Sequence, residues 1–516
     1  MKNIYLYTLL ITFFTVSCVK DNTVNEFKQL NEVSITGLEK SYTFYLFEET
    51  SIVPNVSTVL KDESKLEYRW YMFNNNSRFE ADTISREKNL KVTIGGTPGI
   101  PYTLVFKVID KETGVFYSKT MRMEILGQLT KGTMFLCEEN GVVDVNFMKP
   151  DSSIQRTIFR AANPGEKLGA TPLKIFFINP NAYSPLIMKH VYVTTESPEG
   201  GVVLDPISFK KIKSLREYFY VNPNYSKLKA TFYFKGSLSD YLLMNGKLFN
   251  RAANMADPLW KTELLITAAN QPREYDLASL LIFPDGSPIV FDNKYGRFLK
   301  HEPENKGELF AYLGGSKAAF DYNNSGLEML FNTQTTLPVG STGKYSVAIT
   351  KDPKTGKRYI LKFLVGKRGT DPTTSIYADE KREITEVNYP GLYNSTIFAS
   401  DYASMPGVIW YTSGGKLYSL NSFDSNPTEV LQKDFTSQGL VIDIAKFYRY
   451  QNLNPITGEN ETVTQLRLAV RNSSMKSKGA GMIYMSGNTI GGVNIVETGR
   501  IMGIADRIID FEEKLN

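Results

Sequence analysis

Three aromatic side chains, Trp260, Trp410 and Tyr411, are the residues of this sequence with the clearest chemistry for holding a saccharide. Aromatic rings present a broad apolar face, and such faces stack on sugar rings. Each of the three also lies in a stretch that fits the packed interior of a β-sheet domain. We therefore keep them as candidate ligand-binding residues, with core packing as the alternative.

The carboxylates offer little for catalysis. Glycoside hydrolysis uses two carboxyl groups roughly 5–10 Å apart, and the adjacent Glu138 and Glu139 could in principle supply them. With 54 acidic residues, chance pairs are expected, and neighbouring residues of a strand point to opposite faces. Asp443 lies in an expected strand, where a turn or a hydrogen bond between sheets explains it better than catalysis. We assign no catalytic residue and predict that the protein is not an enzyme.

The sequence contains few residues that could bind a metal or a cofactor. The chain contains 2 histidines, His190 and His301, too few for a multi-histidine metal site. Residues 339–345 (VGSTGKY) superficially resemble a phosphate-binding loop, but the glycine spacing differs, and Tyr345 replaces the Ser or Thr that would hold magnesium. The sequence has no GxSxG, HExxH or EF-hand calcium motif. We expect no metal and no cofactor.

The bulk composition restricts the class of partner and of fold. The chain has 59 basic and 54 acidic residues and no dense run of Lys or Arg, so nucleic-acid binding is not expected. At 516 residues, two or three domains are expected. The aromatic share of 12% favours β structure, because aromatic side chains suit a pleated, half-buried surface.

The amino terminus predicts secretion. Lys2 precedes an apolar run over residues 4–16, which is shorter than the roughly 20 residues of a bilayer span. A positive charge, a short apolar run and a small residue are typical of a signal peptide, which we place at residues 1–17. Residues 15–18 (TVSC) resemble a bacterial lipobox, in which Cys18 becomes the first mature residue and carries the acyl chains.

We therefore expect an anchor at Cys18 followed by a polar tether over residues 18–32. Residues 20–22 (KDN) partly resemble the tag that directs some Gram-negative lipoproteins to the outer face of the outer membrane. The predicted location is the outer membrane, with possible exposure at the cell surface. Cys137 then has no partner for a disulfide, and we expect it to be buried in a strand.

The elements that would position any ligand-binding residue are β-hairpins. Residues 406–421 (PGVIWYTSGGKLYSLN) show the pattern clearly, because two apolar runs flank a glycine-rich corner. Similar corners recur at intervals of roughly 45–65 residues, near the period of kelch blades. The seven expected corners are Asn140-Gly141, Glu199-Gly200-Gly201, Asn245-Gly246, Lys294-Tyr295-Gly296, Lys354-Thr355-Gly356, Gly414-Gly415 and the loop at 474–481.

Residues 128–516 are thus predicted to form a seven-bladed β-propeller with four strands in each blade. Residues 441–446 (VIDIAK) and 501–506 (IMGIAD) resemble each other, so we expect the second copy to close the ring against the first blade. Ring closure removes exposed sheet edges, which otherwise template aggregation. The alternative fold is two or three stacked β-sandwiches. Residues 209–219 (FKKIKSLREYF) are expected to form a short helix.

Residues 33–127 are predicted to form a separate β-sandwich, because short strands with turn signals follow one another at the spacing of that fold. The runs LEYRWYMF, YTLVFKVIDKETG and KTMRMEIL resemble the PKD-like, immunoglobulin-type module of secreted bacterial lipoproteins. Trp70 would be its buried core tryptophan. The sequence departs from the PKD motif after this tryptophan, where residues 72–74 (MFN) replace an aspartate-and-glycine turn.

Taken together, the lipobox, this module and the aromatic-rich repeats resemble the PKD-like family lipoproteins of glycan-foraging Gram-negative bacteria. The resemblance implies a non-enzymatic accessory role in binding or uptake of glycans or other nutrients at the outer membrane. The implied partners are the membrane, through the lipid on Cys18, and a glycan or a TonB-dependent uptake complex. The alternatives are a propeller-type polysaccharide hydrolase or lyase, and an adhesive or scaffold protein.

Overall fold

The computed structural model describes the chain from residue 31 to residue 514 in segments. These are residues 31–46, 48–74, 81–95, 100–169, 171–178, 189–235, 239–252, 259–266, 271–282, 288–301, 308–311, 319–334, 343–366, 376–401, 403–453, 460–475, 477–488 and 494–514. The chain divides after Ile125 into two compact units, each with its own core. In the segments that the structure describes, no helix combines the length and apolar character needed to cross a membrane.

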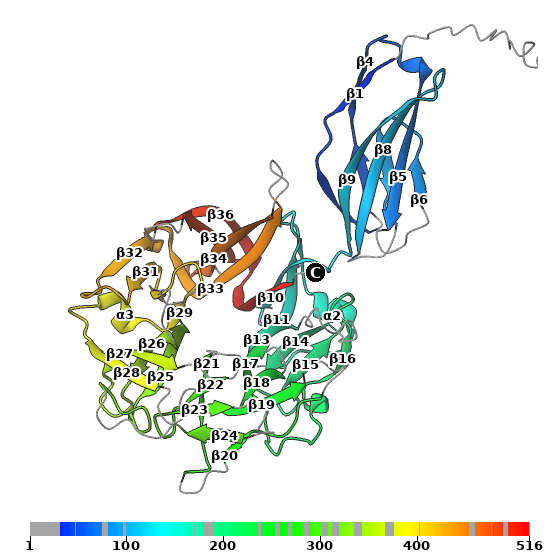
Figure 1. Ribbon diagram of the computed structural model, residues 1–516. Coiled ribbons are helices and arrows are strands. Elements are labelled where there is room, and N and C mark those ends of the chain that lie inside the picture. The colour runs from blue at the N-terminus through cyan, green and yellow to red at the C-terminus, as the bar shows by residue number, and fades with distance from the viewer. Residues whose placement is uncertain are drawn as a thin grey trace, which may run out of the picture. The chain divides into compact units, whose positions relative to one another are not determined.

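Unit 1 is a β-sandwich built on a five-stranded antiparallel sheet (Figure 1). Its order is β2 (Ser41–Tyr45), β9 (Phe116–Leu126), β8 (Pro101–Asp110), β5 (Leu66–Asn74) and β6 (Ala81–Ser85). Two strand pairs complete it: β1 (Val33–Thr36) with β4 (Asn55–Thr58), and β3 (Glu49–Ile52) with β7 (Leu90–Thr93). A 3₁₀ helix, η1 (Glu63–Lys65), precedes β5.

Trp70 lies on β5 between β8 and β6 and is 0% exposed, as predicted. Its indole ring packs against Phe106 with ring centroids 4.4 Å apart. The indole N–H donates to the backbone oxygen of Glu87 at 3.1 Å, so the buried polar atom is satisfied. The residue therefore fixes the core of unit 1, and it offers no face to a ligand.

The strands described in unit 2 form seven sheets. From its inner edge outwards, the first contains β37 (Arg507–Lys514), β10 (Gly132–Glu139), β11 (Val142–Met148) and β12 (Ile154–Gln155). In the same direction, the second contains β13 (Pro172–Ile178), β14 (His190–Thr195), β15 (Gly201–Leu204) and β16 (Lys211–Ser214). The third contains β17 (Ala230–Lys235), β18 (Ser239–Met244) and β19 (Lys247–Ala252).

The fourth sheet has five strands: β21 (Leu277–Ile282), β22 (Ile289–Asp292), β23 (Arg297–His301), β24 (Glu308–Ala311) and β20 (Leu265–Ile266). The fifth contains β25 (Glu328–Gln334), β26 (Gly343–Lys351), β27 (Arg358–Gly366) and β28 (Ile376–Ile384). The sixth contains β29 (Ile397–Ala399), β30 (Val408–Ser413), β31 (Lys416–Asn421) and β32 (Glu429–Asp434). The seventh contains β33 (Leu440–Leu453), β34 (Asn460–Asn472), β35 (Ala480–Asn488) and β36 (Asn494–Ala505). Short helices in unit 2 are α2 (Ile158–Ala162), η2 (Arg216–Tyr218), α3 (Pro390–Asn394) and η4 (Thr436–Gln438).

These sheets follow one another around a ring (Figure 1). A separate apolar cluster fills the space between each sheet and the next. A further cluster lies between the seventh and first sheets and includes Phe135, Met482 and Phe511. A closed cycle of cores is what a propeller requires and what stacked sandwiches lack. The predicted seven-bladed propeller is confirmed, although the third and fourth blades have three and five strands.

The seven predicted glycine-rich corners are also confirmed, and each joins the second and third strands of its blade. In four blades the backbone of the corner is hydrogen-bonded to the segment leading into the next blade. The bonds run from Leu228 N to Ser197 O, Leu277 N to Gly246 O, Ser325 N to Gly296 O, and Ile442 N to Gly414 O, at 2.8–3.0 Å. We call the edge formed by these corners the hairpin rim. Its bonds tie each blade to its successor.

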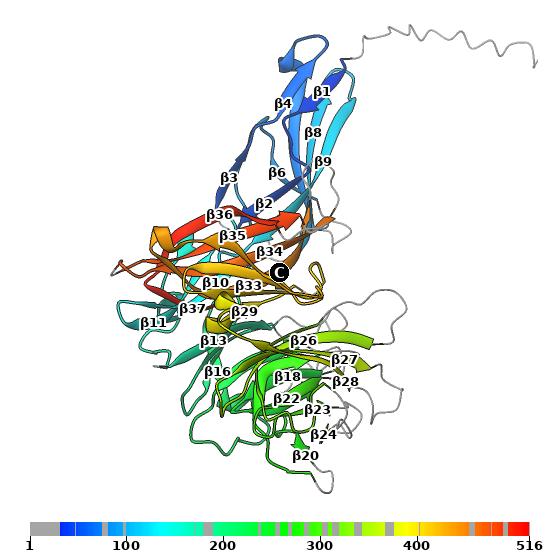
Figure 2. The ribbon, with the colours of Figure 1, turned by 90° about the vertical axis from the view of Figure 1, so that its left-hand side faces the viewer.

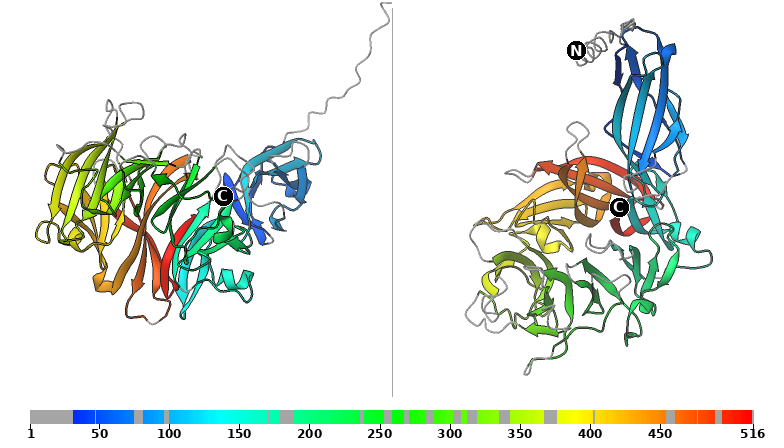
Figure 3. Two further views of the ribbon diagram at one scale, coloured as in Figure 1. Left: turned by 90° about the horizontal axis from the view of Figure 1, so that it is seen from below. Right: turned by 45° about the vertical axis from the view of Figure 1, so that its right-hand side comes forward.

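The ring closes through a different strand from the one predicted. β37 pairs with β10 along its length, so it is the innermost strand of the first sheet, where it contacts β33 and β34 of the seventh (Figure 3). Residues 501–505 instead end β36, the outermost strand of the same sheet in which residues 441–446 lie on the innermost strand. Ile442 and Ile504 are both buried, in different clusters. The similarity of the two stretches therefore reflects similar burial and not an equivalent position.

The helix predicted over residues 209–219 is wrong. The segment forms strand β16 and the 3₁₀ helix η2. β16 pairs with β15, which satisfies backbone groups at the outer edge of the second blade. Leu215, Tyr218 and Phe219 fill the core between the second and third blades. Their spacing looked helical, but tertiary packing decided the local structure.

Candidate functional site

The three aromatic candidates lie inside the propeller. Trp260, Trp410 and Tyr411 are each 0% exposed. They belong to the cores between the second and third, the sixth and seventh, and the fifth and sixth blades, respectively. Since none of their ring faces reaches solvent, the ligand-binding interpretation is corrected: these rings pack blades together.

Two of the candidate carboxylates, Glu139 and Asp443, are held in structural contacts. Glu139 accepts a hydrogen bond from Arg156. Asp443 accepts bonds from Arg471 Nε at 3.0 Å and Nη2 at 3.3 Å, and both residues lie in the seventh blade. Asp443 thus forms an ion pair within one sheet. The expected role was in a turn or in a hydrogen bond between sheets.

Both histidines are buried next to tyrosines. Tyr218 Oη lies 3.2 Å from His190 Nε2, and Tyr241 Oη lies 3.0 Å from His301 Nδ1. Cys137 is 0% exposed on β10, where burial raises the pKa of its thiol above the usual range. Cys18 lies outside the described residues.

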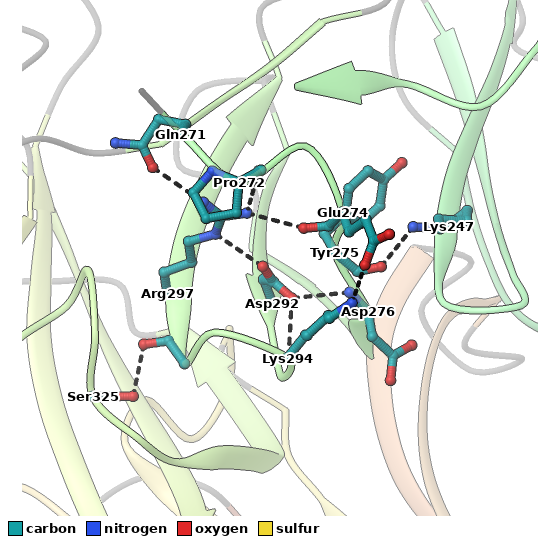
Figure 4. Close-up of polar contacts among 11 residues, drawn as sticks. Lys247, Gln271, Pro272, Glu274, Tyr275, Asp276, Asp292, Lys294, Arg297 and Ser325 are labelled. Atoms are coloured by element: carbon teal, nitrogen blue, oxygen red, sulfur yellow. Dashed lines mark hydrogen bonds and ion pairs between the residues drawn. The ribbon is translucent and has the colours of Figure 1, made fainter. Parts of the chain in front are cut away.

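A buried network on the hairpin rim shows how this fold uses polar residues for structure (Figure 4). Arg297 donates through Nε to Asp292 at 2.9 Å, and through its other nitrogens to Gln271, Pro272 O and Glu274 O at 2.9–3.2 Å. Asp292 Oδ1 also accepts from the backbone of Asp276 and Lys294. Every guanidinium nitrogen has a partner, so the network holds the segment before β21 against the corner between β22 and β23 and leaves no group for a ligand.

A cavity of about 530 Å³ lies at the seam where the ring closes. One wall is the face of the seventh blade that carries Tyr450, Gln465, Arg467 and Tyr484, and the other wall belongs to the first blade. Figure 2 shows the two sheets next to each other, with β33 and β34 beside β10 and β37. At 14 and 13 residues, β33 and β34 are the longest strands that the structure describes, and their extended ends supply Tyr450 and Gln465. We call this space the seam cavity.

Arg467 forms the centre of the seam cavity. Its side chain is 9% exposed, and its guanidinium carbon lies 4.8–5.8 Å from the ring centroids of Tyr448, Tyr450 and Tyr484. Nε donates to Gln465 at 2.8 Å, and Nη1 donates to Glu513. Stacking on aromatic rings and two hydrogen bonds hold the guanidinium in one orientation.

Glu513 is the one carboxylate among the described residues that line the seam cavity. Its Oε1 accepts from Thr133 Oγ1 at 2.5 Å and from Arg467. Burial raises the pKa of this carboxyl, and Arg467 and Thr133 oppose that shift. The lining also carries Lys131, Lys149 and Arg500, so positive groups outnumber negative ones.

A second charged cluster lies on the innermost strands beside the seam cavity. Asp510 is 0% exposed, pairs with Lys446 at 2.8 Å and accepts from Ile175 N at 3.1 Å. Lys446 also lies 3.8 Å from Glu512, whose side chain is 29% exposed. Burial raises the pKa of Glu512 to about 7 despite the opposing effect of Lys446. This cluster joins β33, β37 and β13 at the point of closure.

A larger cavity of about 690 Å³ lies between the first blade, α2 and the second blade. Its lining includes Glu138, Arg160, Lys167 and Arg507 beside aliphatic residues. Arg160 is paired with Asp144 at 2.5 Å. Because no aromatic ring is among the described residues of its lining, this cavity is less suited to a sugar than the seam cavity.

Sequence reasoning did not single out the residues of the seam cavity. A signal was present, since Tyr448 and Tyr450 alternate on β33, and Gln465 and Arg467 alternate on β34. Alternate residues of a strand share one face, so both pairs put polar and aromatic groups on one side of the sheet. The partner strand β37 lies far away in sequence, and no local pattern could place Glu513 opposite them.

The PKD-like family pattern matches residues 18–172. This range covers the whole of the sandwich and continues through the strands β10, β11 and β12 of the first blade. No curated protein sequence matches the chain.

Several solved structures are similar to the chain at low identity. A quinonprotein alcohol dehydrogenase-like protein from Bacteroides thetaiotaomicron is 13% identical, with 90% of this chain and 95% of that chain covered and a TM-score of 0.34. The dihydro-heme d1 dehydrogenase NirN is 9% identical over 75% of this chain and 76% of its own, with a TM-score of 0.36. AztD from Citrobacter koseri is 12% identical over 71% of this chain and 95% of its own, with a TM-score of 0.30.

Proposed function

We propose that this protein is a lipid-anchored surface protein that binds glycans without transforming them, through the seam cavity of its propeller. The observation that carries the proposal is the lining of that cavity. Tyr450 and Tyr484 supply aromatic rings, and Gln465, Arg467 and Glu513 supply hydrogen-bonding groups of both kinds. Apolar ring faces with a few convergent polar groups are the usual composition of a saccharide site.

Binding explains the cavity better than hydrolysis does. Two carboxyl groups at a suitable separation perform most glycoside hydrolysis, whereas the described lining holds Glu513 alone, and that carboxylate is engaged by Arg467 and Thr133. A polysaccharide hydrolase or lyase remains the alternative function, and an adhesive scaffold is the third.

The test is a glycan array probed with the chain lacking residues 1–24, which keeps every described residue, with product analysis on the same sugars. Binding without product supports the proposal, and turnover of a bound polysaccharide would replace it with the enzyme. Neither binding nor turnover would leave the scaffold.

Anchoring is tested separately. The full chain is expected to incorporate a fatty-acid label and to fractionate with membranes, and Cys18→Ser should abolish both. Capture of a TonB-dependent transporter from solubilised outer membranes by the anchored wild-type chain would extend the proposal to an uptake complex.

A further inference from the structure

The charge of the seam cavity indicates which class of saccharide the cavity would bind. Four cationic side chains, Lys131, Lys149, Arg467 and Arg500, line it against the one carboxylate of Glu513. The first two come from the first blade and the other two from the seventh. Arg500 is paired with Glu497 at 2.8 Å, and even without it the positive groups of the described lining outnumber Glu513. Charges of one sign around a concave, low-dielectric space concentrate the potential there and attract a ligand of the opposite sign.

Arg467 has hydrogen-bonding capacity that the protein does not use. A guanidinium has five N–H donors. Nε and Nη1 donate to Gln465 and Glu513, but Nη2 makes no hydrogen bond to any residue that the structure describes. The residue as a whole is 7% exposed, but Nη2 is not among the buried polar atoms that lack a partner, so this nitrogen keeps contact with the solvent of the cavity. A ligand oxygen in the cavity would satisfy it.

The surroundings of Arg467 favour a ring that bears a carboxylate. Tyr450 and Tyr484 lie on either neighbouring strand of the same sheet face, with Gly499 directly opposite Tyr484. A side chain at Gly499 would begin 3.7 Å from the Tyr484 ring, so the glycine leaves room over that ring. The planar fork of an arginine suits a planar carboxylate, and the tyrosine rings suit the face of a sugar.

We propose that the seam cavity recognises an acidic saccharide, with the sugar ring against Tyr450 and Tyr484 and its carboxylate on Arg467 and the neighbouring lysines. This inference rests on the proposed function, since it names the ligand class of the same site. Glu513 and Gln465 then bind the sugar hydroxyls.

The experiment uses titration calorimetry on the chain lacking residues 1–24 with matched ligands. The panel contains oligomers of galacturonate, glucuronate and mannuronate and sialyllactose, each beside its own methyl ester, together with sodium sulfate. The ester keeps the sugar ring and removes the charge. We expect at least one acid to bind about tenfold or more tightly than its ester, because a charge-assisted hydrogen bond is lost. The affinity of the acid should fall as salt is added.

Each other outcome is decisive. Equal binding of acid and ester, or binding of neutral sugars alone, would overturn the inference and leave the proposed function standing. If sulfate bound as tightly as the acidic sugars, the cavity would be a site for simple anions, and the inference of an acidic saccharide would be wrong. Failure of every acid, ester and arrayed neutral glycan to bind would overturn the inference and the proposed function together.

Three variants connect the affinity to the cavity. Arg467→Gln should weaken the acid about tenfold or more and leave the ester nearly unchanged. Gly499→Leu should block both ligands by filling the space over Tyr484. The control is Arg471→Gln, on the same strand but paired with Asp443 outside the cavity, and it should change neither affinity. Thermal unfolding of each variant shows that it is folded.

Discussion

Two buried arginines in the same ring have opposite surroundings. Arg297, on the hairpin rim, is 2% exposed and directs all three of its nitrogens to protein acceptors. Arg467, in the seam cavity, is 7% exposed and bonds through two nitrogens. Burial alone therefore does not separate scaffold from site in this protein. The presence of a guanidinium nitrogen without any bond to the described part of the protein does, because such a nitrogen can donate to a ligand.

The largest expected effect comes from breaking the complete network. Arg297→Met leaves Asp292, which is 0% exposed, without its ion-pair partner. Breaking a buried pair from one side costs about 3–5 kcal/mol. We expect a loss of that order in the free energy of unfolding by chemical denaturation. If the double variant Arg297→Met with Asp292→Leu were no more stable than the single variant, the uncompensated charge would not be the cause.

The next largest effect concerns the corner beside that network. A Cβ at Gly296 would lie 2.7 Å from the backbone nitrogen of Gly326, and φ is +61°. Gly326 has nearly the same φ, +66°, with open space around its would-be Cβ. We expect Gly326→Ala to cost about 1–2 kcal/mol for backbone strain alone. Gly296→Ala should cost about 1–3 kcal/mol more for the clash. If both variants lowered the melting temperature equally, the backbone at Gly296 would be able to move to accept the Cβ, and the corner would not hold the two blades together.

Arg467, which bonds through two of its nitrogens, should show the reverse of Arg297: a smaller effect on stability and a larger effect on ligand affinity. Arg467→Met is expected to reduce stability by about 1–2 kcal/mol, less than the same change at Arg297, because Glu513 is partly exposed and can take up a proton. Its effect on glycan affinity should be about tenfold or more, whereas Arg297→Met should leave the affinity of the folded fraction unchanged. Denaturation and calorimetry on the two variants compare them directly. Equal stability losses would remove the distinction between the two arginines.

The smallest effect is a pH dependence at the seam. The pKa of Glu512 is raised to about 7 in the folded chain from an ordinary value of 4.5. Between those values the folded state keeps a proton that the unfolded state releases, so this stabilisation is complete below about pH 4.5 and is lost as pH rises through 7. The change should be on the order of 1–2 kcal/mol, since the group is partly exposed. Glu512→Gln should flatten the profile of stability between pH 5 and 7, and an unaltered profile would contradict this assignment.

The repeating part of the fold could be predicted because it is encoded locally. A glycine such as Gly296 or Gly414 adopts a positive φ at its corner, and apolar runs on both sides show the strands. Each glycine-rich corner marks one blade, so the seven corners found in the local sequence were enough to predict seven blades. Residues 209–219 show the limit, since burial between two blades gave a helical spacing to a segment that forms β16 and the 3₁₀ helix η2.

The site could not be predicted in the same way, because it lies where distant segments meet. Trp260 and Trp410 were candidates because of their residue type. In the structure both are 0% exposed, since a large aromatic ring stabilises a core through the large area that it buries. The lining of the seam cavity combines Arg467 and Glu513, which are 46 positions apart, with Thr133, which precedes Glu513 by 380 positions. Only closure of the ring brings them together, and closure depends on which strand lies beside β10.

Pairing of β37 with β10 makes the last strand of the propeller a partner of its earliest one. Until Arg507–Lys514 has been synthesised, an emerging chain has no seventh seam, and one edge of its first sheet stays open. Translation that stops before this strand would leave the seam open and remove Glu513 from the lining of the seam cavity. The same eight residues thus close the ring and supply the carboxylate of the seam cavity.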